Sequence, residues 1–593
     1  MCGICGELRF DNGAPDLALI KRMTAELARR GPDHDGVITD GPLAFGHRRL
    51  AIIDLSARAD QPLVDRDLRL ALVFNGTIYN YKELRAELVG MGYAFFSEGD
   101  SEVILKAYHA WGEKCVERFF GMFAFAVWDM RFGTLFLARD RFGIKPLYYS
   151  LEGVRLRFAS TVQSLLAAGD VDTRIDRIAL HHHLTLHAVV PAPRTLLEGV
   201  RKLPPAMTLT IGRDGRFSQR CYWSLEATRP QRALSEEDWL TATRYVLGRA
   251  VDRHRHAADV PVGVLLSGGL DSSLVVAMMA QQGVHNLLTF SIGFEHAPDE
   301  PGDEFEFSDL VAAHFGTRHH RYSISNAELL ARIPETVRHM SEPMVSQDVA
   351  AFHLLGEKVH EHAKVVMSGQ GADEVFGGYP WYLRMQAERG APLERFARHY
   401  FDRRHDEYLQ AVTPAFHVAD VTSEAVAAAL ARPGADEFLD QVLRFDVTTL
   451  IVDDPVKRVD NMMMAWAVEA RVPFLDHEVV ELAARMPPSL RLREGGKFPL
   501  KAVARGLVPD AVIDRPKVGF PVPALKYVRG PFLEYMRGLL DSKACRERGL
   551  FERAYVEKLL AEPEAHTTPL QGSKLWHLAL LEAWLQENVD SRR

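Results

Sequence analysis

The sequence predicts a multidomain α/β protein in which antiparallel sheets come first and a doubly wound parallel sheet follows. The first two hundred residues contain short β-rich runs separated by Gly, Asn-Gly and Asp, as in 70–80 (LALVFNGTIYN) and 123–140 (FAFAVWDMRFGTLFLARD), which is typical of stacked antiparallel sheets. Short apolar runs at 260–266, 287–294 and 364–369 then alternate with helical stretches, which indicates βαβ units. From about residue 388 the pattern is mostly helical.

Composition excludes several classes of protein. The chain has 593 residues, of which 47% are hydrophobic and 25% charged, so disorder is not its main state. With 71 Lys+Arg against 79 Asp+Glu the net charge is −8, so we expect small-molecule partners and no nucleic acid. No apolar run reaches the roughly 18 residues of a membrane helix, and we expect no membrane contact. Five cysteines, an odd number, indicate a reduced protein of the cytoplasm.

Cys2 is the most informative residue. Removal of the initiator methionine would leave a cysteine that carries both a thiol and a free α-amine. Because an α-amine titrates at about 7.7–8.0 and a thiol at about 8.5, the amine can accept the thiol proton. A Cys2–Cys5 redox or metal pair is less favoured, because no second pair of ligands with zinc spacing exists and the start is strand-like. We expect Cys5 to be a core thiol.

Other segments can complete a site around Cys2. Arg49 offers a guanidinium for a carboxylate, and Asp100 offers a carboxylate for an ammonium. Asn75-Gly76 offers a side-chain amide and an unobstructed backbone N–H, as an oxyanion hole requires, and 30–33 (RGPD) supplies a rigid turn. Taken alone, each has a simpler explanation, since Asn-Gly is first a hairpin signal and a single Arg is usually solvated. Their joint presence behind an N-terminal cysteine favours catalysis.

These motifs resemble the class II glutamine amidotransferase domain, an N-terminal-nucleophile (Ntn) hydrolase with a four-layer αββα sandwich. The resemblance rests on MCGICG, RRGPD, GHRRLAIIDL, VFNGTIYNY, EGDSEVIL, GMFAFAVWD and ARDRFGIKPLYY. It implies that the Cys2 thiolate attacks the side-chain amide of glutamine and releases ammonia. It also implies that Asn75 and Gly76 form the oxyanion hole and that Arg49 and Asp100 bind the two ends of free glutamine.

A second candidate site begins at 267–273 (SGGLDSS), between a predicted strand and a helix. Its glycines and serines can direct several donors at a phosphate, the helix N-terminus adds partial positive charge, and Asp271 can hold Mg²⁺. It is not a Walker A loop, because no Lys follows, and a turn used only for packing is the simpler alternative. The loop resembles the pyrophosphate loop of N-type ATP pyrophosphatases. The resemblance implies ATP or pyrophosphate contacts from Leu266, Ser267, Gly268, Gly269, Asp271, Ser272, Ser273, Ile292, Ser368 and Gly369.

Three downstream motifs extend the resemblance to the asparagine synthetase family: SGQGADEVFGGY (368–379), EARVPFLDH (469–477) and GKFPLK (496–501). The resemblance implies an adenine nucleotide α-hydrolase-like fold, ATP as substrate and Mg²⁺ held by Asp271, Asp373 and Glu374. Lys497 is then the cation that neutralises charge developing at the α-phosphate. Two carboxylates in a turn are usually only solvated, so the role of Asp373 and Glu374 depends on the resemblance.

The motifs divide the chain into four parts. We expect a glutaminase domain (2–205), a hairpin and linker (206–235), a synthetase domain (236–525) and a helical C-terminal extension (526–593). An enclosed path between the two sites is also expected, because ammonia has to arrive unprotonated and before water hydrolyses the adenylate. A homodimer is one option for the assembly.

Gln370 departs from the family pattern. Asparagine synthetases usually carry Glu or Asp here, and a neutral amide cannot pair with a substrate ammonium, so we expect an acceptor without a free α-amine. The segments 368–379 and 187–197 (HAVVPAPRTLL) resemble the N-acetylglutaminylglutamine amidotransferase branch, which makes a compatible solute, an osmoprotectant. One alternative is an asparagine synthetase acting on aspartate that tolerates the Gln. Another is a glutaminase or ligand-binding protein with an inactive synthetase half.

His181, His182 and His183 follow one another in a helical stretch. Adjacent helical side chains point about 100° apart. They cannot converge on one metal ion, and we expect none of the three histidines to be a metal ligand.

Overall fold

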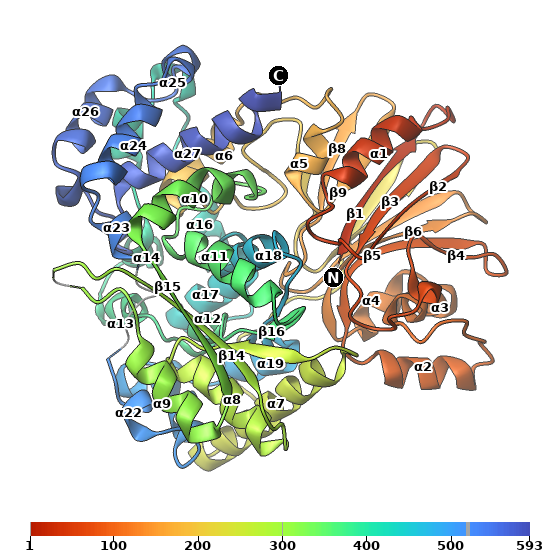
Figure 1. Cartoon of the computed structure of the whole chain (residues 1–593), viewed down its shortest axis with the longest axis horizontal. Helices are drawn as coiled ribbons and strands as arrows, with labels where there is room; N and C mark the ends of the chain where they lie inside the picture. The colour runs from red at the N-terminus through yellow and green to blue at the C-terminus, as the bar shows by residue number, and fades with distance from the viewer. Residues whose placement is uncertain (1, 299, 517–521, 593) are drawn as a thin grey trace.

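The computed structural model describes residues 2–298, 300–516 and 522–592 (Figure 1). Met1, whose removal the N-terminal site requires, lies outside these ranges. In Figure 1 the N-terminal part, coloured red to orange, forms two sheets on one side of the molecule. A third sheet and most of the helices lie on the other side.

Two six-stranded antiparallel sheets face each other in the N-terminal part. Their strand orders are β10-β8-β9-β1-β3-β2 and β12-β11-β7-β6-β5-β4. The inner faces form one core, where Ile4 and Phe45 of the first sheet pack with Val73 and Trp128 of the second. The strands are β1 (Cys2–Arg9), β2 (His34–Asp40), β3 (Leu43–Arg49), β4 (Leu63–Asp65), β5 (Leu70–Ile78), β6 (Gly121–Asp129), β7 (Thr134–Arg139), β8 (Tyr148–Glu152), β9 (Arg155–Ala159), β10 (Arg201–Lys202), β11 (Met207–Gly212) and β12 (Phe217–Cys221).

Helices cover both outer faces of this pair of sheets. On the first sheet lie α1 (Leu17–Ala25), which packs on β1 and β3, and α5 (Val162–Leu166). On the second lie α3 (Asp100–Trp111), which packs on β5, and α2 (Tyr81–Gly90). The arrangement confirms the predicted αββα sandwich. Helices were expected at 17–28 and 82–88, whereas α3 was not predicted.

The third sheet has five parallel strands in the order β15-β14-β13-β16-β17. The chain starts at the central β13, moves outward to β15, and returns to β16 and β17 on the other side, which confirms the predicted doubly wound sheet. Ligands bind such sheets where the strand order reverses, here beside β13 and β16. The strands are β13 (Val262–Leu265), β14 (Leu288–Phe294), β15 (Arg318–Ile324), β16 (Val365–Met367) and β17 (Glu469–Arg471). The sequence reasoning missed the edge strands β15 and β17.

Helices make up most of the second half. Ser235 and Asp238 form a capping box at the start of α7, which explains why the helix begins there. Two π-helical turns, Asp446–Leu450 and Val452–Val456, lead into α18. The helices used below are α6 (Arg177–Thr185), α7 (Glu236–His256), α8 (Leu270–Gln281), α10 (Asn326–Arg338), α11 (Asp348–His360), α12 (Ala372–Phe376), α15 (His405–Ala411), α16 (Val421–Ala431), α18 (Lys457–Met464), α21 (Phe498–Ala504), α24 (Gly530–Leu540) and α27 (Lys574–Asn588).

The C-terminal helix α27 packs against α10 and α24 (Figure 1). The indole N–H groups of Trp576 and Trp584 donate to the carbonyls of Val345 and Met340 at 3.0 and 2.8 Å. Its hydrophobic residues share a core cluster with residues of α1 and α5. Helix α27 therefore contacts both halves of the molecule.

A buried network of charges joins the two halves. The side chains of Arg30 and Lys145 donate to the two carboxylate oxygens of Asp460 on α18, at 3.0 and 2.9 Å. Burial by itself raises the pKa of Asp460, but the two cations outweigh it and lower the pKa. Nearby, the hydroxyl of Thr77 on β5 donates to Glu469 on β17 at 3.2 Å. The second antiparallel sheet is thus held directly against the edge of the parallel sheet.

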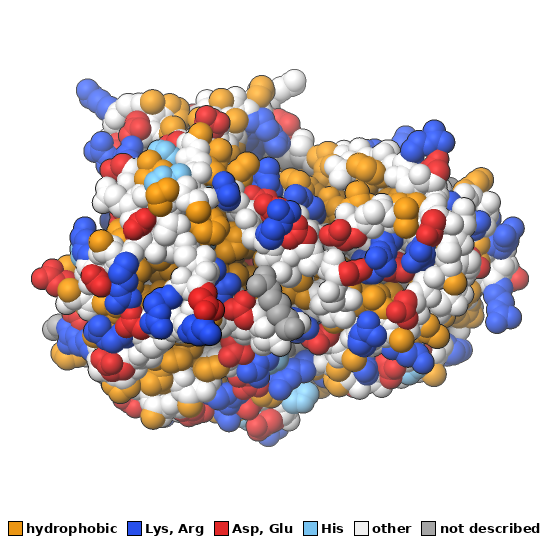
Figure 2. Space-filling model, turned by 90° about the horizontal axis from the view of Figure 1, so that it is seen from above, with side chains coloured by type: hydrophobic (Ala, Val, Ile, Leu, Met, Phe, Trp, Pro, Cys, Tyr) orange, Lys and Arg blue, Asp and Glu red, His pale blue; other side chains and the backbone are white. Residues whose placement is uncertain are grey.

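Figure 2 shows acidic and basic side chains interspersed over one face of the molecule, without an extended patch of one sign on that face. Among the described residues, no helix combines the length and the apolar character needed to cross a membrane.

Asp460→Ala should destabilise the protein strongly. It leaves the buried Arg30 and Lys145 without their carboxylate, and such losses cost about 3–5 kcal/mol. We expect a midpoint of thermal unfolding several degrees below that of the unmodified chain.

The control is Asp35→Ala, whose carboxylate is 65% exposed and lies 3.6 Å from Arg48. This change should alter stability by no more than about 0.5 kcal/mol. Equal unfolding midpoints for the two variants would show that the junction network does not stabilise the fold.

Candidate active sites

Cys2 lies at the start of β1, where the two antiparallel sheets face each other. It pairs with Arg49 on β3, and its backbone N–H donates to Oδ1 of Asn75 on β5, at 3.1 Å. The Cys2 residue is 6% exposed, and burial raises the pKa of its thiol. At neutral pH the thiol therefore needs a base to form the nucleophilic thiolate.

Asn75 and Gly76 lie beside this cysteine. The Asn75 side chain is fully buried, and its Nδ2 has no hydrogen-bond partner among the described residues. A buried donor without a partner is costly unless a ligand accepts its hydrogen bond. Gly76 has φ of 154°, and a Cβ there would lie 2.2 Å from the carbonyl oxygen of Met122. Only glycine fits this backbone position.

Arg49 and Asp100 lie at the same site, since both charges influence the Cys2 thiol. The Arg49 guanidinium is held in one orientation by Asp60, at 2.6 Å, and by the backbone carbonyls of Ser56, Ile53 and Asp54. Asp100 opens α3, and its Oδ2 accepts from the N–H of Ile78 at 3.0 Å. Burial raises the pKa of Asp100 to about 6. The structure thus brings together all five residues predicted for the glutaminase site.

The loop 267–273 connects β13 to α8 and forms a cradle for an anion. The Ser267 hydroxyl accepts from the N–H of Gly269 at 3.2 Å and lies 3.2 Å from the Ser272 hydroxyl. Gly268 has φ of 76°, and a Cβ there would lie 2.6 Å from the backbone nitrogen of Ser308. The buried Ser273 hydroxyl has no partner among the described residues. Unused donors at a helix N-terminus suit a phosphate.

A cavity of about 490 Å³ opens over this loop, at the carboxyl ends of β13, β14 and β16. Gly268, Ser273 and Glu374 are not part of its lining, although their neighbours are. The remaining residues predicted for ATP, pyrophosphate, Mg²⁺ and the acceptor all line it: Leu266, Ser267, Gly269, Asp271, Ser272, Ile292, Ser368, Gly369, Gln370, Asp373 and Lys497.

Lys497 holds the two walls of this cavity together. Its Nζ lies 2.5 Å from Oδ2 of Asp271 and 2.6 Å from Oδ1 of Asp373. Burial lowers the pKa of Lys497, but the two carboxylates outweigh it and raise the pKa, so the ammonium stays charged. Lys497 also has φ of 57°, and a Cβ at Gly378 would lie 2.1 Å from its Cε. Because both carboxylates reach one point, they also offer the oxygen donors that Mg²⁺ prefers.

Glu374 lies behind Asp373 on α12. Its Oε1 accepts from the Tyr379 hydroxyl at 2.8 Å, and its Oε2 has no hydrogen-bond partner among the described residues. Burial and then the charge of Asp373 raise the pKa of Glu374 to about 7. Asp446, in the first π-helical turn, acts on the same group and accepts a hydrogen bond from Tyr382. Asp446 was missed in the sequence analysis, because nothing in its neighbourhood forms a motif.

Gln370 and Arg458 line the same cavity. The backbone N–H of Gln370 donates to the Ser368 hydroxyl at 3.4 Å. Arg458 lies 3.1 Å from Asp348 through Nε and donates to Asp454 at 2.6 Å through Nη1. The sequence analysis missed Arg458, whose only local signal is the i, i+4 spacing from Asp454.

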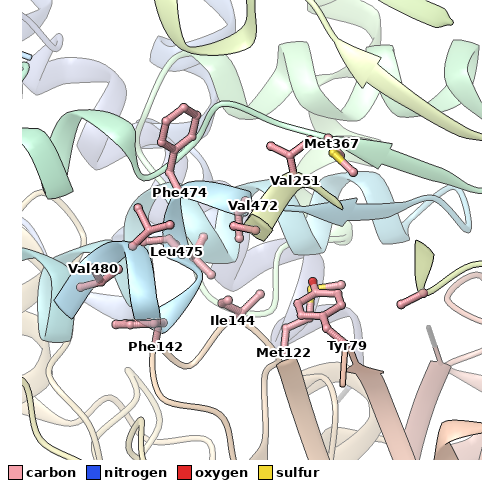
Figure 3. Close-up of a cluster of buried hydrophobic side chains, with 14 of the residues drawn as sticks. Tyr79, Met122, Phe142, Ile144, Val251, Met367, Val472, Phe474, Leu475 and Val480 are labelled. Atoms are coloured by element: carbon pink, nitrogen blue, oxygen red, sulfur yellow. The ribbon is translucent and has the colours of Figure 1, made fainter. Parts of the chain in front are cut away.

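Apolar side chains fill the space where the second antiparallel sheet meets the half that contains the parallel sheet (Figure 3). Tyr79, Met122 and Ile144 come from the N-terminal part and point toward Val472 and Met367 of the other half (Figure 3). All five are buried. The two halves thus share one apolar core at their junction.

Two of the three consecutive histidines contact the same hydroxyl in the structure, and the third lies apart from it. Nδ1 of His181 and Nδ1 of His182 lie 2.5 and 3.0 Å from the Thr422 hydroxyl, whereas neither ring nitrogen of His183 has a partner among the described residues. Burial lowers the pKa of His181 and His182 to about 4 and that of His183 to about 3. The three rings do not converge on one point.

Comparison with known proteins identifies the class. Residues 1–223 match the glutamine amidotransferase domain, and residues 242–586 match asparagine synthase. The chain is 32% identical to glutamine-hydrolysing asparagine synthetase 1 of Bacillus subtilis (strain 168), with 100% of this chain and 98% of the relative covered. It is 30% identical to synthetase 3 of the same organism, over the full length of both chains. It is 33% identical to a putative glutamine-hydrolysing asparagine synthetase of Mycobacterium tuberculosis (strain ATCC 25618 / H37Rv), covering 98% and 97%.

The fold, the two sites and these matches define an ATP-dependent, glutamine-hydrolysing ligase. More particularly, the chain belongs to the asparagine synthase family and carries an N-terminal glutamine amidotransferase domain.

Proposed function

We propose that this enzyme amidates an acceptor carboxylate through an acyl-adenylate, with ammonia supplied by Cys2. In our proposal residues 2–205 are the glutaminase unit, 236–525 the synthetase unit, and 206–235 the connection between them. Residues 526–593 are a helical extension, in which α27 contacts both units. The observation that carries the proposal is the pairing of a buried N-terminal cysteine with an anion cradle across one apolar junction.

In the glutaminase unit the Cys2 thiol would attack the side-chain carbonyl carbon of glutamine. The α-amine exposed by removal of Met1 takes the thiol proton. The unused Nδ2 of Asn75 and the N–H of Gly76 are the donors for the resulting oxyanion. Loss of ammonia leaves a glutamyl thioester on Cys2, and water releases glutamate and restores the thiol.

Glutamine recognition would use the two charges beside Cys2. The Arg49 guanidinium, fixed by its backbone contacts, meets the α-carboxylate, and Asp100 meets the α-ammonium. Both side chains are almost fully buried, so the ligand charges are met in a water-poor site. A glutamine within a peptide lacks both charges and is rejected.

In the synthetase unit an oxygen of the acceptor carboxylate would attack the α-phosphorus of ATP, and pyrophosphate leaves. The loop Ser267–Ser273 with Ser368 and Gly369 holds the pyrophosphate, and Leu266 and Ile292 line the nucleotide side. Lys497 neutralises charge at the α-phosphate. Asp271 and Asp373, with Glu374 behind them, would hold Mg²⁺, which supplies further positive charge to the phosphates. Ammonia then attacks the acyl carbon, and AMP leaves.

Ammonia would travel between the units through the apolar junction of Figure 3. Apolar surroundings disfavour protonation of ammonia to ammonium, which is not a nucleophile. They also keep water from the acyl-adenylate.

For the acceptor we propose N-acetylglutaminylglutamine, whose terminal carboxylate has no free α-ammonium next to it. Gln370 lines the cavity as a neutral amide, and the neighbouring Asp348 is paired with Arg458 at 3.1 Å. These groups suit the neutral amide next to the acceptor carboxylate better than they would suit an α-ammonium at that place. Aspartate is the second candidate, favoured by the names of the relatives, which are asparagine synthetases.

Pyrophosphate release from ATP, measured with glutamine and either acceptor, tests this choice. We expect kcat/KM for N-acetylglutaminylglutamine to exceed that for aspartate by about 100-fold, because an unpaired or missing polar contact costs about 1–3 kcal/mol. Gln370→Glu should lower the ratio of kcat/KM for N-acetylglutaminylglutamine to that for aspartate. A preference for aspartate in the unmodified enzyme would overturn the acceptor and leave the reaction class intact.

Two variants should separate the two sites. Cys2→Ala should lower glutamine-dependent synthesis by about 10³-fold or more while ammonia-dependent synthesis continues, because only the nucleophile is lost. Lys497→Ala should abolish synthesis from both nitrogen sources and leave glutamine hydrolysis in place. Glutamate and pyrophosphate are measured in parallel.

The controls are Cys221→Ala, which removes an exposed thiol, and Lys21→Ala, which removes an exposed lysine. Both should behave as the unmodified enzyme. Loss of ammonia-dependent synthesis in Cys2→Ala would contradict the division of roles.

Glutamine use should fall at acid pH because of Asp100. Its pKa is raised to about 6, so the carboxylate loses its charge as the pH falls through that value, and with it the partner for the substrate ammonium. We expect kcat/KM for glutamine to drop about tenfold per pH unit below that point. The Asp100→Asn enzyme should have a low kcat/KM for glutamine at every pH, without the fall at acid pH. If kcat/KM for glutamine fell with pH in the same way in both enzymes, the titrating group would not be Asp100.

A further inference from the structure

A second cluster of ligand-type side chains lies outside both sites, where α6, α15 and the start of α16 meet. Nε2 of His181 on α6 lies 3.0 Å from Nδ1 of His405, the first residue of α15. The same Nε2 lies 3.9 Å from Oδ1 of Asp420, which caps α16. These three atoms all lie within 4.8 Å of one another. They come from three separate elements and still point at one place.

Neighbouring side chains hold the His181 ring in place, whereas the side of the cluster formed by Asp420 is exposed to solvent. His181 is fully buried, and the ring of Tyr408 packs edge-on against it with centroids 4.4 Å apart. His405 is half-buried, and the side chain of Asp420 is 38% exposed. An ion can therefore enter from solvent, and water can complete its coordination.

Thr422 couples the tautomer of His181 to that of His182. Its hydroxyl lies 2.5 Å from Nδ1 of His181 and 3.0 Å from Nδ1 of His182. A hydroxyl has one proton, so it donates to one ring and accepts from the other. When it donates to His182 it accepts from Nδ1–H of His181, which leaves the lone pair of His181 Nε2 directed at His405 and Asp420. Such an outer hydrogen bond fixes the tautomer of a metal-binding histidine.

We propose that His181, His405 and Asp420 bind a first-row transition metal ion, with Zn²⁺ as the ion of best fit. Two imidazoles and one carboxylate suit Zn²⁺, whereas Mg²⁺ and Ca²⁺ require oxygen ligands. Ligand atoms about 2.0–2.1 Å from a tetrahedral ion lie about 3.3–3.4 Å apart, between the two separations of 3.0 and 3.9 Å found here. Small side-chain rotations suffice.

The ion would tie α6 to α15 and to the first turn of α16. It replaces the hydrogen bond between the two histidines by two stronger bonds and adds the carboxylate. His182 and His183 take no part as ligands, as the sequence predicts, whereas the proposal departs from that prediction for His181, whose partners come from other elements.

Two other clusters are less suited to an ion. An oxygen of Asp402 lies 3.0 Å from Nδ1 of His187 and 3.2 Å from Nδ1 of His577, and all three residues are buried, so the carboxylate is already paired. In the third cluster, Nδ1 of His339 is bonded to the backbone carbonyl of Glu335 at 2.9 Å.

Isothermal titration of metal-stripped full-length protein with Zn²⁺ tests the site. We expect one ion per chain with a micromolar or tighter dissociation constant. Asp420→Asn and His405→Gln should each weaken binding at least tenfold. Asn caps a helix as well as Asp does, so Asp420→Asn separates metal binding from the capping of α16. Co²⁺ bound to the unmodified chain should show visible d–d absorption that both variants lack.

His360→Gln, an exposed histidine at the end of α11, serves as the matched control and should bind Zn²⁺ as the unmodified chain does. Circular dichroism and glutamine hydrolysis check that every variant is folded. Two results would overturn the proposal: no Zn²⁺ binding above that of the doubly substituted chain, or undiminished binding in His405→Gln and Asp420→Asn. The second result would place the ion elsewhere, at Cys2 or at the His187–Asp402–His577 cluster.

Discussion

Asp460, buried where the two halves meet, accepts hydrogen bonds from Arg30 and Lys145, and Arg30 also contacts the backbone of Cys2. The Nε of Arg30 donates to the backbone carbonyl of Cys2 at 3.3 Å while its Nη2 donates to Asp460. Moving one half against the other would leave buried charges without partners, which is far more costly than losing exposed ones. The position of Cys2 therefore depends on the position of the synthetase half, and the two active sites keep one fixed relation.

The apolar core between the sites has a chemical consequence as well as a structural one. Side chains of β6 and of the segment after β17 pack at the same junction, so burial of apolar surface joins the halves along the path that we propose for ammonia. At the far end, Lys497 is held between Asp271 and Asp373 from two different loops of the parallel sheet. In the reaction that we propose, a charged lysine kept at that point is already in place to meet a developing negative charge.

The parts of the fold and of the sites that could be predicted depend on residues that are adjacent in the sequence. The loop Ser267–Ser273 and the pair Asn75-Gly76 were found because glycine and small polar residues at adjacent positions determine the local backbone. Asp446, Arg458 and the strand β17 were missed, because their roles arise from contacts with residues far away in the chain, such as that of Arg458 with Asp348. The order β15-β14-β13-β16-β17 likewise needs pairings that no local pattern encodes.

The sequence by itself determined the chemistry that is available: a cysteine next to the initiator methionine, a Gly-Ser loop after a buried strand, and the change from antiparallel to alternating strand–helix rhythm. Only the tertiary structure decided how that chemistry is tuned. Burial raises the pKa of Asp100 and of Glu374, and it is folding that brings His181 to His405 and Asp420. The physical reason is that side-chain identity and backbone preference are local, whereas desolvation, charge pairing and ligand convergence are sums over residues that meet only in the folded chain.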